Sequence, residues 1–316
     1  MDLKLFEDFL ALADCRNFSK AAAFRNSTQS AFSRRIQLLE AWAGGDLIDR
    51  KASPLGLTPA GDAMVELAIE NVRAIKHGRE EIAAISSKCI STISFAVTYS
   101  LSLKFFPRWM HEIETKLGRS SIRLMSYDGE RCREAVSRGD CHFMISHYQS
   151  RLGHDFEKSR LKSLVLATDT LIPVMTGNSE RQHLSLNGSP GQRRIPYLKY
   201  TPGSFMGRTL DLFLETLESP PDLETRFETS VAEGMKGMIV EGHGLGWLPK
   251  SLINGELEAG QLVRVGPASW DLDFEVRIFR PTTRLPKSAE LLWQLVSNET
   301  GFASAFPADT PRAYAK

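Results

Sequence analysis

The chain has 316 residues, of which 42% are hydrophobic and 24% are charged, and its formal net charge is +1 at pH 7. These values are typical of a soluble globular protein with about two or three domains. They exclude a generally basic nucleic-acid coat, so any DNA affinity would have to come from a local basic patch. No apolar run approaches the roughly 20 residues that cross a bilayer, and the N-terminus lacks the apolar core of a signal peptide. We therefore expect a cytoplasmic protein without membrane association.

Four cysteines stand at positions 15, 89, 132 and 141, without a CxxC pair and without a histidine at metal-ligand spacing. Cys132 and Cys141 are close enough in sequence to suggest a disulfide switch. However, one falls on an expected helix and the other at the start of an expected strand, so nothing indicates that their Cβ atoms converge. We expect buried, reduced thiols, no metal site and no cofactor.

Residues 18–58 show the pattern of two short helices, a turn and a basic wing. Ser19 can cap a first helix, and the polar run from Asn26 to Thr28 ends it and caps the next. The next helix is expected from Gln29 to about Trp42, with an apolar stripe on one face and polar side chains on the other. Such a helix can lie in the DNA major groove with its N-terminal side chains at the base edges.

A short strand at Leu47 and Ile48 is expected to lead into the wing, whose cations would contact phosphates and position the protein without reading sequence. The alternative is that a short arginine-bearing helix is simply a solvated surface. The residues that we expect at double-stranded DNA are Ser19, Gln29, Ser30, Ser33, Arg34, Arg35, Arg50 and Lys51.

A long helix is expected to follow, with Thr58 as its cap, Pro59 in its first turn and its end near Ser87. Apolar residues recur in it every three or four positions, which predicts a dimerisation coil or, alternatively, an amphipathic helix packed on its own domain. The residues that follow this spacing are Val65, Ala68, Val72, Ile75 and Ile82, with the charged Arg79 among them.

From Ile90 onward, apolar strands alternate with helices, which indicates an α/β fold with largely parallel sheets. Two subdomains of similar size are expected, with the chain crossing between them near residues 160–167 and again near residues 262–269.

In open α/β sheets, ligands bind beyond the carboxyl ends of the strands, where helix N-termini offer free N–H groups. Three strand-to-helix turns have this character, at residues 98–102, 201–206 and 229–230. A single Ser or Thr in such a turn is more commonly only a helix cap, but three turns at matching places favour a pocket between the subdomains. The residues that we expect to line it are Ser100, Ser102, His147, Thr201, Ser204, Met206 and Ser230.

The N-terminal motifs resemble those of the LysR-type transcriptional regulators over about 55 residues: FSKAA, then TQSAFSRRIQLLE, then LIDR, then LTPAG. Later, GHGLGWLP resembles a segment of the same family. Ser30 stands where the family often has proline, and Ile48-Asp49 replaces its usual pair before Arg50. The resemblance implies a winged helix-turn-helix at residues 1–59, a dimerisation helix at 60–88, and an effector-binding module at 89–316 that resembles periplasmic binding proteins. Its subdomain I would cover about 89–163 and 268–302, and its subdomain II about 164–267.

A finer resemblance links TYSLSL, CRNFSKAA and YLKYTPGSFMGRTLDLFL to the hypochlorite-responsive HypT branch of this family. In that branch an SxMGR methionine is implicated in oxidant sensing, which the resemblance transfers to Met206. Oxidation would turn its apolar thioether into a polar acceptor. Two alternatives stay open, because a methionine in a helix is more often core filler: control by an oxidant, or control by a small metabolite such as an organic acid.

The predicted function is therefore a LysR-type, sequence-specific DNA-binding regulator controlled at a cleft between two subdomains, and a homodimer or homotetramer. No nucleophile elbow, phosphate-binding Gly loop, or carboxylate pair beside a histidine suggests an enzyme, so no catalytic residue is expected.

Overall fold

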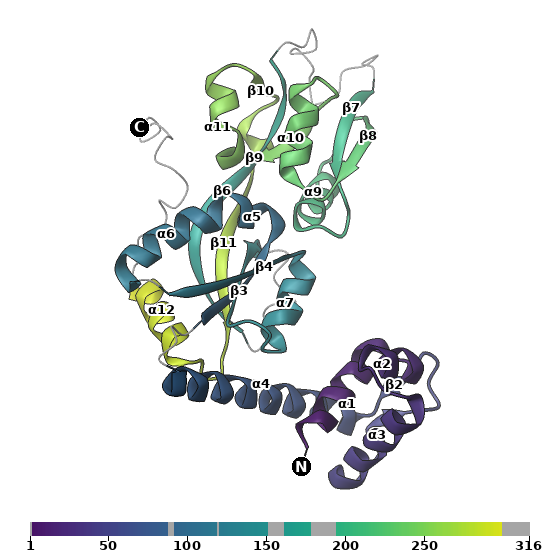
Figure 1. Cartoon of the computed structure of the whole chain (residues 1–316). Coiled ribbons are helices and arrows are strands. Elements are labelled where there is room, and N and C mark those ends of the chain that lie inside the picture. The colour runs from purple at the N-terminus through teal and green to yellow at the C-terminus, as the bar shows by residue number, and fades with distance from the viewer. Residues whose placement is uncertain (1, 88–91, 119, 151–160, 178–193, 299–316) are drawn as a thin grey trace.

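The computed structural model describes residues 2–87, 92–118, 120–150, 161–177 and 194–298. Cys89, the expected boundary at 88–89 and the C-terminal part from residue 299 lie outside these residues. Figure 1 shows a small helical domain at the N-terminus, one long helix, and an elongated α/β module with two lobes. The expected fold class is confirmed. None of the helices in the described residues is both long enough and apolar enough to cross a membrane.

The N-terminal domain packs three helices against a two-stranded wing. Asn17, rather than Ser19, caps the second helix: its side chain accepts a hydrogen bond from the Lys20 N–H at 3.0 Å. Thr28 caps the third helix as expected, and Gly44 ends it at a φ of +78°. The elements are α1 (Leu3–Cys15), α2 (Phe18–Phe24), α3 (Gln29–Ala43), β1 (Ile48–Asp49) and β2 (Gly56–Leu57).

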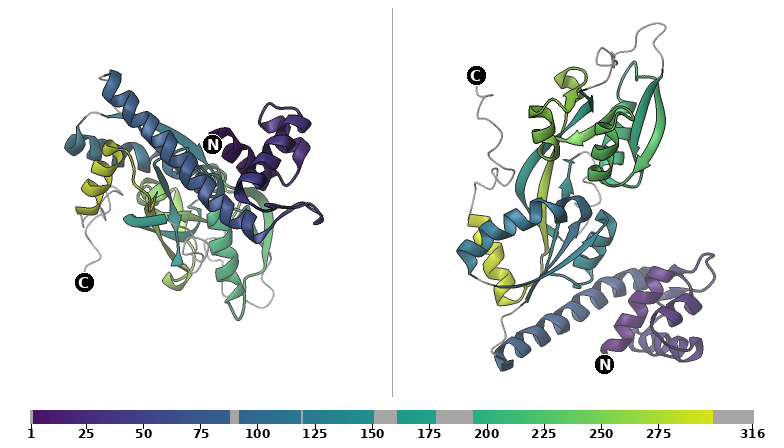
Figure 2. Two further views of the ribbon diagram at one scale, coloured as in Figure 1. Left: turned by 90° about the horizontal axis from the view of Figure 1, so that it is seen from below. Right: turned by 45° about the horizontal axis from the view of Figure 1, so that its top comes forward.

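The long helix α4 (Pro59–Ser87) begins at Thr58, whose hydroxyl accepts a hydrogen bond from the Gly61 N–H at 3.0 Å. Its first half belongs to the core of the N-terminal domain, since Met64, Ala68 and Val72 are buried there. Its second half leaves that domain and runs along the lower side of the α/β module (Figures 1 and 2). The residues of the predicted stripe therefore do not share one surface: those in the first half of α4 pack inside the N-terminal domain, and those in the second half lie outside it.

Subdomain I is the lobe next to α4. Strand β3 lies between β4 and β5 and is parallel to both, with Phe95 opposite Leu124 and Phe143. Its core includes the fully buried ring of Trp109. The elements are β3 (Thr92–Thr98), α5 (Tyr99–Leu103), α6 (Phe105–Leu117), β4 (Ser121–Tyr127), α7 (Gly129–Ser137), β5 (Phe143–Tyr148) and α12 (Lys287–Asn298).

Subdomain II has a separate core built around Trp247 and Tyr200, both fully buried. Two of its strands, β7 and β8, form a parallel pair, while β9 and β10 add to the main sheet. The elements are β7 (Ile195–Tyr200), α9 (Phe205–Glu215), β8 (Leu223–Thr229), α10 (Ala232–Val240), β9 (Gly246–Pro249), α11 (Lys250–Glu258) and β10 (Leu262–Arg264).

Two long antiparallel strands, β6 (Leu161–Thr176) and β11 (Leu272–Pro281), connect the subdomains. They pair along their length and shift register between Val276 and Arg277. The sheet order is β10-β6-β11-β5-β3-β4, with β9 also on β6. The expectation of largely parallel sheets is wrong, because every pair that involves β6 or β11 is antiparallel. The second crossing lies in β11, later than expected, because two long strands rather than loops connect the subdomains. We call β6 and β11 together the hinge.

Candidate DNA interface and effector cleft

The N-terminus of α3 offers a polar, exposed surface. Gln29, Ser30 and Arg34 are exposed and Ser33 is half-buried. The Ser19 hydroxyl donates to the Gln29 side-chain oxygen at 3.1 Å, so the starts of α2 and α3 lie side by side. Within the part of the chain that the structure describes, Arg34 belongs to no ion pair shorter than 4 Å. Its guanidinium can therefore bind a base or a phosphate without breaking an existing contact.

Arg35 does not share this surface, and its assignment to DNA is corrected. Its Nε forms an ion pair with the fully buried carboxylate of Asp8, and its Nη2 donates to the Ser27 hydroxyl at 3.0 Å. Arg25 binds the other oxygen of Asp8 at 2.8 Å and also Glu7 at 2.6 Å. A carboxylate without solvent needs such partners. Arg35 therefore holds α3 against α1.

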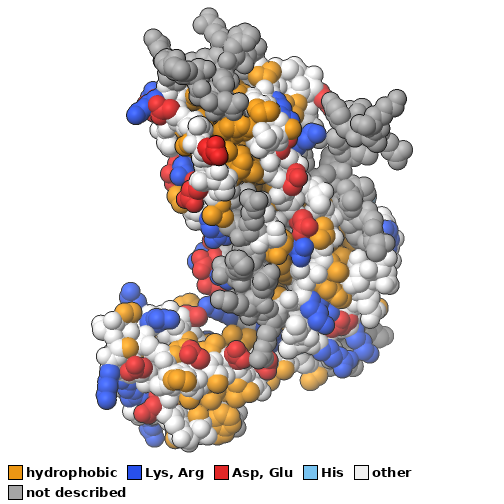
Figure 3. Space-filling model, turned by 180° about the vertical axis from the view of Figure 1, so that it is seen from behind, with side chains coloured by type: hydrophobic (Ala, Val, Ile, Leu, Met, Phe, Trp, Pro, Cys, Tyr) orange, Lys and Arg blue, Asp and Glu red, His pale blue; other side chains and the backbone are white. Residues whose placement is uncertain are grey.

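The wing carries one engaged cation and one available cation. Arg50 forms an ion pair of 2.6 Å with Glu40, whose other oxygen accepts from the Leu47 and Ile48 N–H groups at 3.1 and 3.3 Å. Lys51 is exposed and forms no ion pair within the described residues. Figure 3 shows Lys and Arg side chains gathered at the outer end of the N-terminal domain. Lys51 is thus better placed than Arg50 for a phosphate contact.

A cavity of about 220 Å³ lies between the subdomains, and we call it the cleft cavity. Two of the expected effector residues, Ser100 and His147, contribute to it. The lining consists of Ser100, Leu101, Lys104, Phe105, Arg108, His147, Asp169, Ala232, Glu233, Pro249, Ser251 and Leu252.

The charged walls of the cleft cavity come from opposite subdomains. Lys104 and Arg108, at the start of α6, supply two cations, and Glu233, in the first turn of α10, supplies a carboxylate. Asp169 of β6 is already engaged: it accepts from the Ser251 hydroxyl at 2.5 Å and from the Thr170 N–H at 2.8 Å. Burial raises the pKa of Asp169 against the opposing effect of these hydrogen bonds. The sequence predicted none of these four, although Lys104 and Arg108 stand one helical turn apart just after the first strand-to-helix turn.

His147 joins the two lobes through aromatic contacts. Its ring stacks on Phe205 of α9, with 5.4 Å between centroids, and meets Phe274 of β11 edge-on at 5.2 Å. Burial lowers the pKa of His147 to about 3, so the ring is neutral at physiological pH. On the wall of the cleft cavity, His147 therefore presents an uncharged ring, whose nitrogens can form hydrogen bonds.

Five expected effector residues do not line the cleft cavity. The Ser102 hydroxyl pairs with Ser126 at 2.8 Å, and Ser204 caps α9 by accepting from the Gly207 N–H at 3.0 Å. The Thr201 carbonyl accepts from the Ser204 hydroxyl at 2.7 Å, and Ser230 is exposed at the end of β8. Met206 is 6% exposed and packs in the core of subdomain II, so its placement at the cleft wall is corrected.

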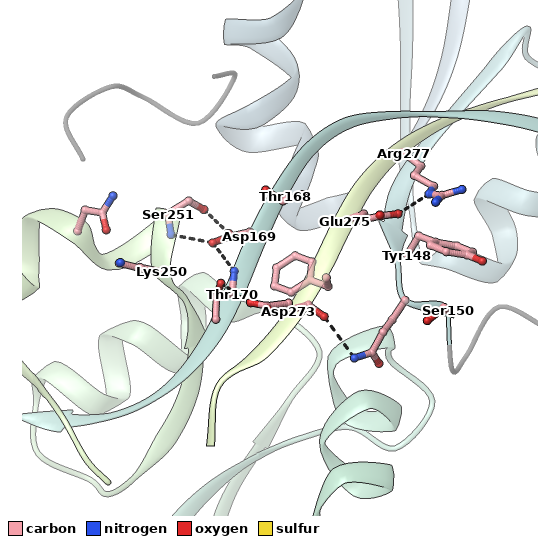
Figure 4. Close-up of a pocket in the computed structure, with 13 residues that line it drawn as sticks. Tyr148, Ser150, Thr168, Asp169, Thr170, Lys250, Ser251, Asp273, Glu275 and Arg277 are labelled. Carbon is pink, nitrogen blue, oxygen red and sulfur yellow. Dashed lines mark hydrogen bonds and ion pairs between the residues drawn. The ribbon is translucent and has the colours of Figure 1, made fainter. Parts of the chain in front are cut away.

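A second, larger hollow of about 700 Å³ lies around β6 and β11 and shares Asp169 and Ser251 with the cleft cavity. Figure 4 shows that most of its charged groups are already paired. Arg277 binds Glu275 at 2.5 Å and stacks over Tyr148 at 4.1 Å, and Asp273 accepts from the Thr170 hydroxyl at 2.8 Å. This arrangement stabilises the hinge and leaves few groups for a ligand.

The described cysteines are free thiols. Burial raises the pKa of Cys132 to about 12 and raises that of Cys141 further. Because the thiolate is the reactive form, both behave as apolar core groups at neutral pH.

Comparison with known proteins agrees with this architecture. Residues 3–62 match the model of the bacterial regulatory helix-turn-helix protein, lysR family, and residues 90–301 match the LysR substrate binding domain. The HTH-type transcriptional regulator YjiE of Escherichia coli K12 is 29% identical over 294 residues, which are 93% of each chain.

Two solved structures are similar over 94% of this chain. Vibrio fischeri DarR in complex with DNA is 28% identical, with a TM-score of 0.53 over 99% of its chain. Full-length HypT of Salmonella typhimurium, a hypochlorite-specific LysR-type regulator, is 26% identical, with a TM-score of 0.55 over 98% of its chain. The two family models together cover most of the sequence and correspond to the DNA-binding and effector-binding parts seen here. The chain is thus a transcriptional regulator rather than an enzyme, and it belongs to the LysR family.

Proposed function

We propose that this regulator binds its operator through the α3 surface and the wing, and that a small molecule in the cleft cavity controls its output. The observation that carries the proposal is the cavity itself, which is lined by both subdomains and by the β6 strand that connects them. A molecule that touches both walls stabilises the closed arrangement of the lobes, and it shifts the equilibrium only by its differential affinity for the two arrangements. DNA-binding domains that are paired as dimers or tetramers would change their spacing with that closure.

Control by an oxidant is the second candidate, and the similarity to HypT favours it. Met206 stands beside Phe205, which stacks on His147 across the two lobes. A sulfoxide in the core of subdomain II would place a polar oxygen among apolar side chains and disturb that packing. The route would therefore be indirect, through the fold of subdomain II, and not through a cleft wall.

The test begins with a map of genomic binding sites with and without hypochlorite, which supplies the operator. Regulated output is then compared in Ser100→Ala, Met206→Ile and Met206→Gln. Control at the cleft cavity predicts a lost response in Ser100→Ala and an unchanged response in Met206→Ile. Control by oxidation predicts the reverse, with constitutive output from Met206→Gln. Wild-type regulation in all three variants would contradict both candidates.

A further inference from the structure

We propose that the effector of the cleft cavity is a zwitterion, an α-amino acid of modest size with an apolar side chain. This inference rests on the proposed function, because it names the class of ligand for that same cavity. Its basis is the placement of two cations and one available carboxylate on opposite walls, with apolar side chains between them.

The cationic wall lies at the start of α6. Lys104 and Arg108 are one turn apart and both are exposed, and no described carboxylate lies within 4 Å of either. Glu256, which lies within electrostatic reach of Lys104, is already paired with Lys236 at 2.5 Å. Arg108 can thus bind a ligand carboxylate through two parallel N–H groups, with Lys104 as a second charge.

The anionic wall is Glu233. One of its carboxylate oxygens is buried and has no hydrogen-bond partner in the described structure. Asp169 cannot take the same role, because Ser251 and Thr170 occupy its oxygens. A carboxylate with an unpaired oxygen is costly, and a ligand ammonium against Glu233 would offset that cost by neutralising its charge.

The space between the two walls is apolar and small. Leu101, Phe105, Ala232, Pro249 and Leu252 line it, and the neutral ring of His147 adds no charge. A volume of about 220 Å³ is below the range of drug-sized pockets, so it suits a small metabolite. An amino acid with an aliphatic or aromatic side chain would meet both charged walls and the apolar surface.

A pocket that supplies a buried polar partner rejects analogues that lack the matching group, because its own group is then left unpaired. The des-amino analogue of the effector should accordingly bind at least about 10-fold more weakly. The amine without its carboxylate should also bind more weakly, because Lys104 and Arg108 would face no anion.

The experiment is isothermal titration of the full-length chain with the twenty common L-amino acids, followed by matched analogues of each binder. For leucine these are 4-methylpentanoate and 3-methylbutylamine, and for phenylalanine 3-phenylpropanoate and 2-phenylethylamine. Glu233→Gln should remove most of the preference for the amino acid over the carboxylate. Arg108→Met should weaken both by a similar factor. Lys287→Met, an exposed cation on α12 outside the cavity, is the matched control and should change neither.

The proposal of a zwitterionic effector is refuted if no amino acid binds or if the des-amino carboxylate binds as tightly as the amino acid. It is also refuted if Glu233→Gln still prefers the amino acid over that carboxylate. A mobility shift with operator DNA separates this failure from failure of the proposed function. If another small molecule alters operator binding and Arg108→Met abolishes that effect, only the ligand class is wrong. If operator binding responds to nothing that enters the cavity, both proposals are wrong.

Discussion

Arg34 and Arg35 are adjacent in the sequence but face different environments, and this difference gives a direct test of the DNA surface. Arg34 is exposed and available, so Arg34→Ala should weaken operator binding by about 1–3 kcal/mol and relax base preference. Mobility shifts at matched salt would measure this. Lys4→Ala, which removes an exposed cation from α1, is the control and should leave affinity unchanged. Equal affinity of Arg34→Ala and the parent would remove α3 from the interface.

Asp8 should matter for stability rather than for DNA. Its side chain is fully buried between Arg25 and Arg35, so Asp8→Ala leaves Arg35 without its carboxylate and Arg25 with Glu7 alone. We expect a loss of about 3 kcal/mol, at the low end for a broken buried pair because both arginines retain some solvent contact. Amide exchange in residues 2–58 would measure it. Asp14→Ala, whose carboxylate is exposed, should cost less than about 1 kcal/mol.

His147 should make stability depend on pH. Its folded pKa is about 3, well below the ordinary value of about 6.5, so below pH 6.5 the unfolded chain binds a proton that the folded chain does not. Stability is therefore fully present above about pH 7 and declines as the pH falls toward 3. When thermal unfolding is measured at pH 7.5 and at pH 5, the melting temperature of His147→Phe should fall less between the two pH values than that of the parent. His111→Gln, on the exposed side of α6, should behave like the parent.

The sequence could indicate the α3 surface but could not separate Arg34 from Arg35. Helical periodicity places both near the polar side, and the partner that draws Arg35 inward stands 27 positions earlier, in another helix. The same limit applies to Met206, Ser102 and Ser204. Turn chemistry placed them correctly at strand-to-helix junctions, yet whether such a residue caps a helix, fills a core or faces a cavity depends on the neighbouring subdomain.

Among the elements, α4 is clamped to subdomain I of the same chain. Arg73, which is buried, donates to the carbonyls of Val136 and Ser137 at the C-terminal end of α7, and to the Thr283 hydroxyl at 3.2 Å. A Cβ at Gly139 would lie 2.7 Å from Arg73 Cγ, so the absent side chain makes room for the arginine. Lys76 binds Asp140 at 2.7 Å beside it.

Arg73→Met should loosen this clamp, because it removes the donor to the Ser137 carbonyl and one of the donors to the Val136 carbonyl, at a cost of about 1–3 kcal/mol. Hydrogen exchange should accelerate in residues 134–142 and in the second half of α4. Gly139→Ala should act in the same direction, through steric contact and its φ of +71°. Lys76→Ala removes only a partly exposed ion pair and should have a small effect. Unchanged exchange in Arg73→Met would show that the contact does not hold α4.

Element order was the most predictable level of this fold, while the hinge was not. Alternating apolar strands and helices indicated the α/β module, and the cap at Thr58 gave the start of α4. The hinge strands could not be inferred from local pattern, because pairing between β6 and β11 joins residues about a hundred positions apart. The same non-local pairing makes most of the sheet antiparallel.

For the whole molecule, the exposed part of α4 points to assembly. The core of the N-terminal domain includes Met64, Ala68 and Val72. In contrast, the exposed fractions of Leu67, Ile75 and Ile82 are 40%, 51% and 66%. These three lie on one side of the helix, within an arc of about 80°, since 8 residues turn about 80° past two full turns and 7 residues about 20° short of two. A Cβ at Gly78, between Ile75 and Ile82, would meet no atom within 4 Å, so a second helix can approach closely there.

We propose that this side of α4 pairs with its copy in a second chain, and that regulatory modules pair separately to give a tetramer. Ile75→Asp would place a charge in the seam at a desolvation cost that the paired helices cannot recover. Sedimentation velocity should show the variant shifted to a smaller assembly. Glu66→Ala, on the same helix, is the control and should sediment like the parent. A monomeric parent, or an unchanged assembly of Ile75→Asp, would mean that these apolar side chains cover a different partner.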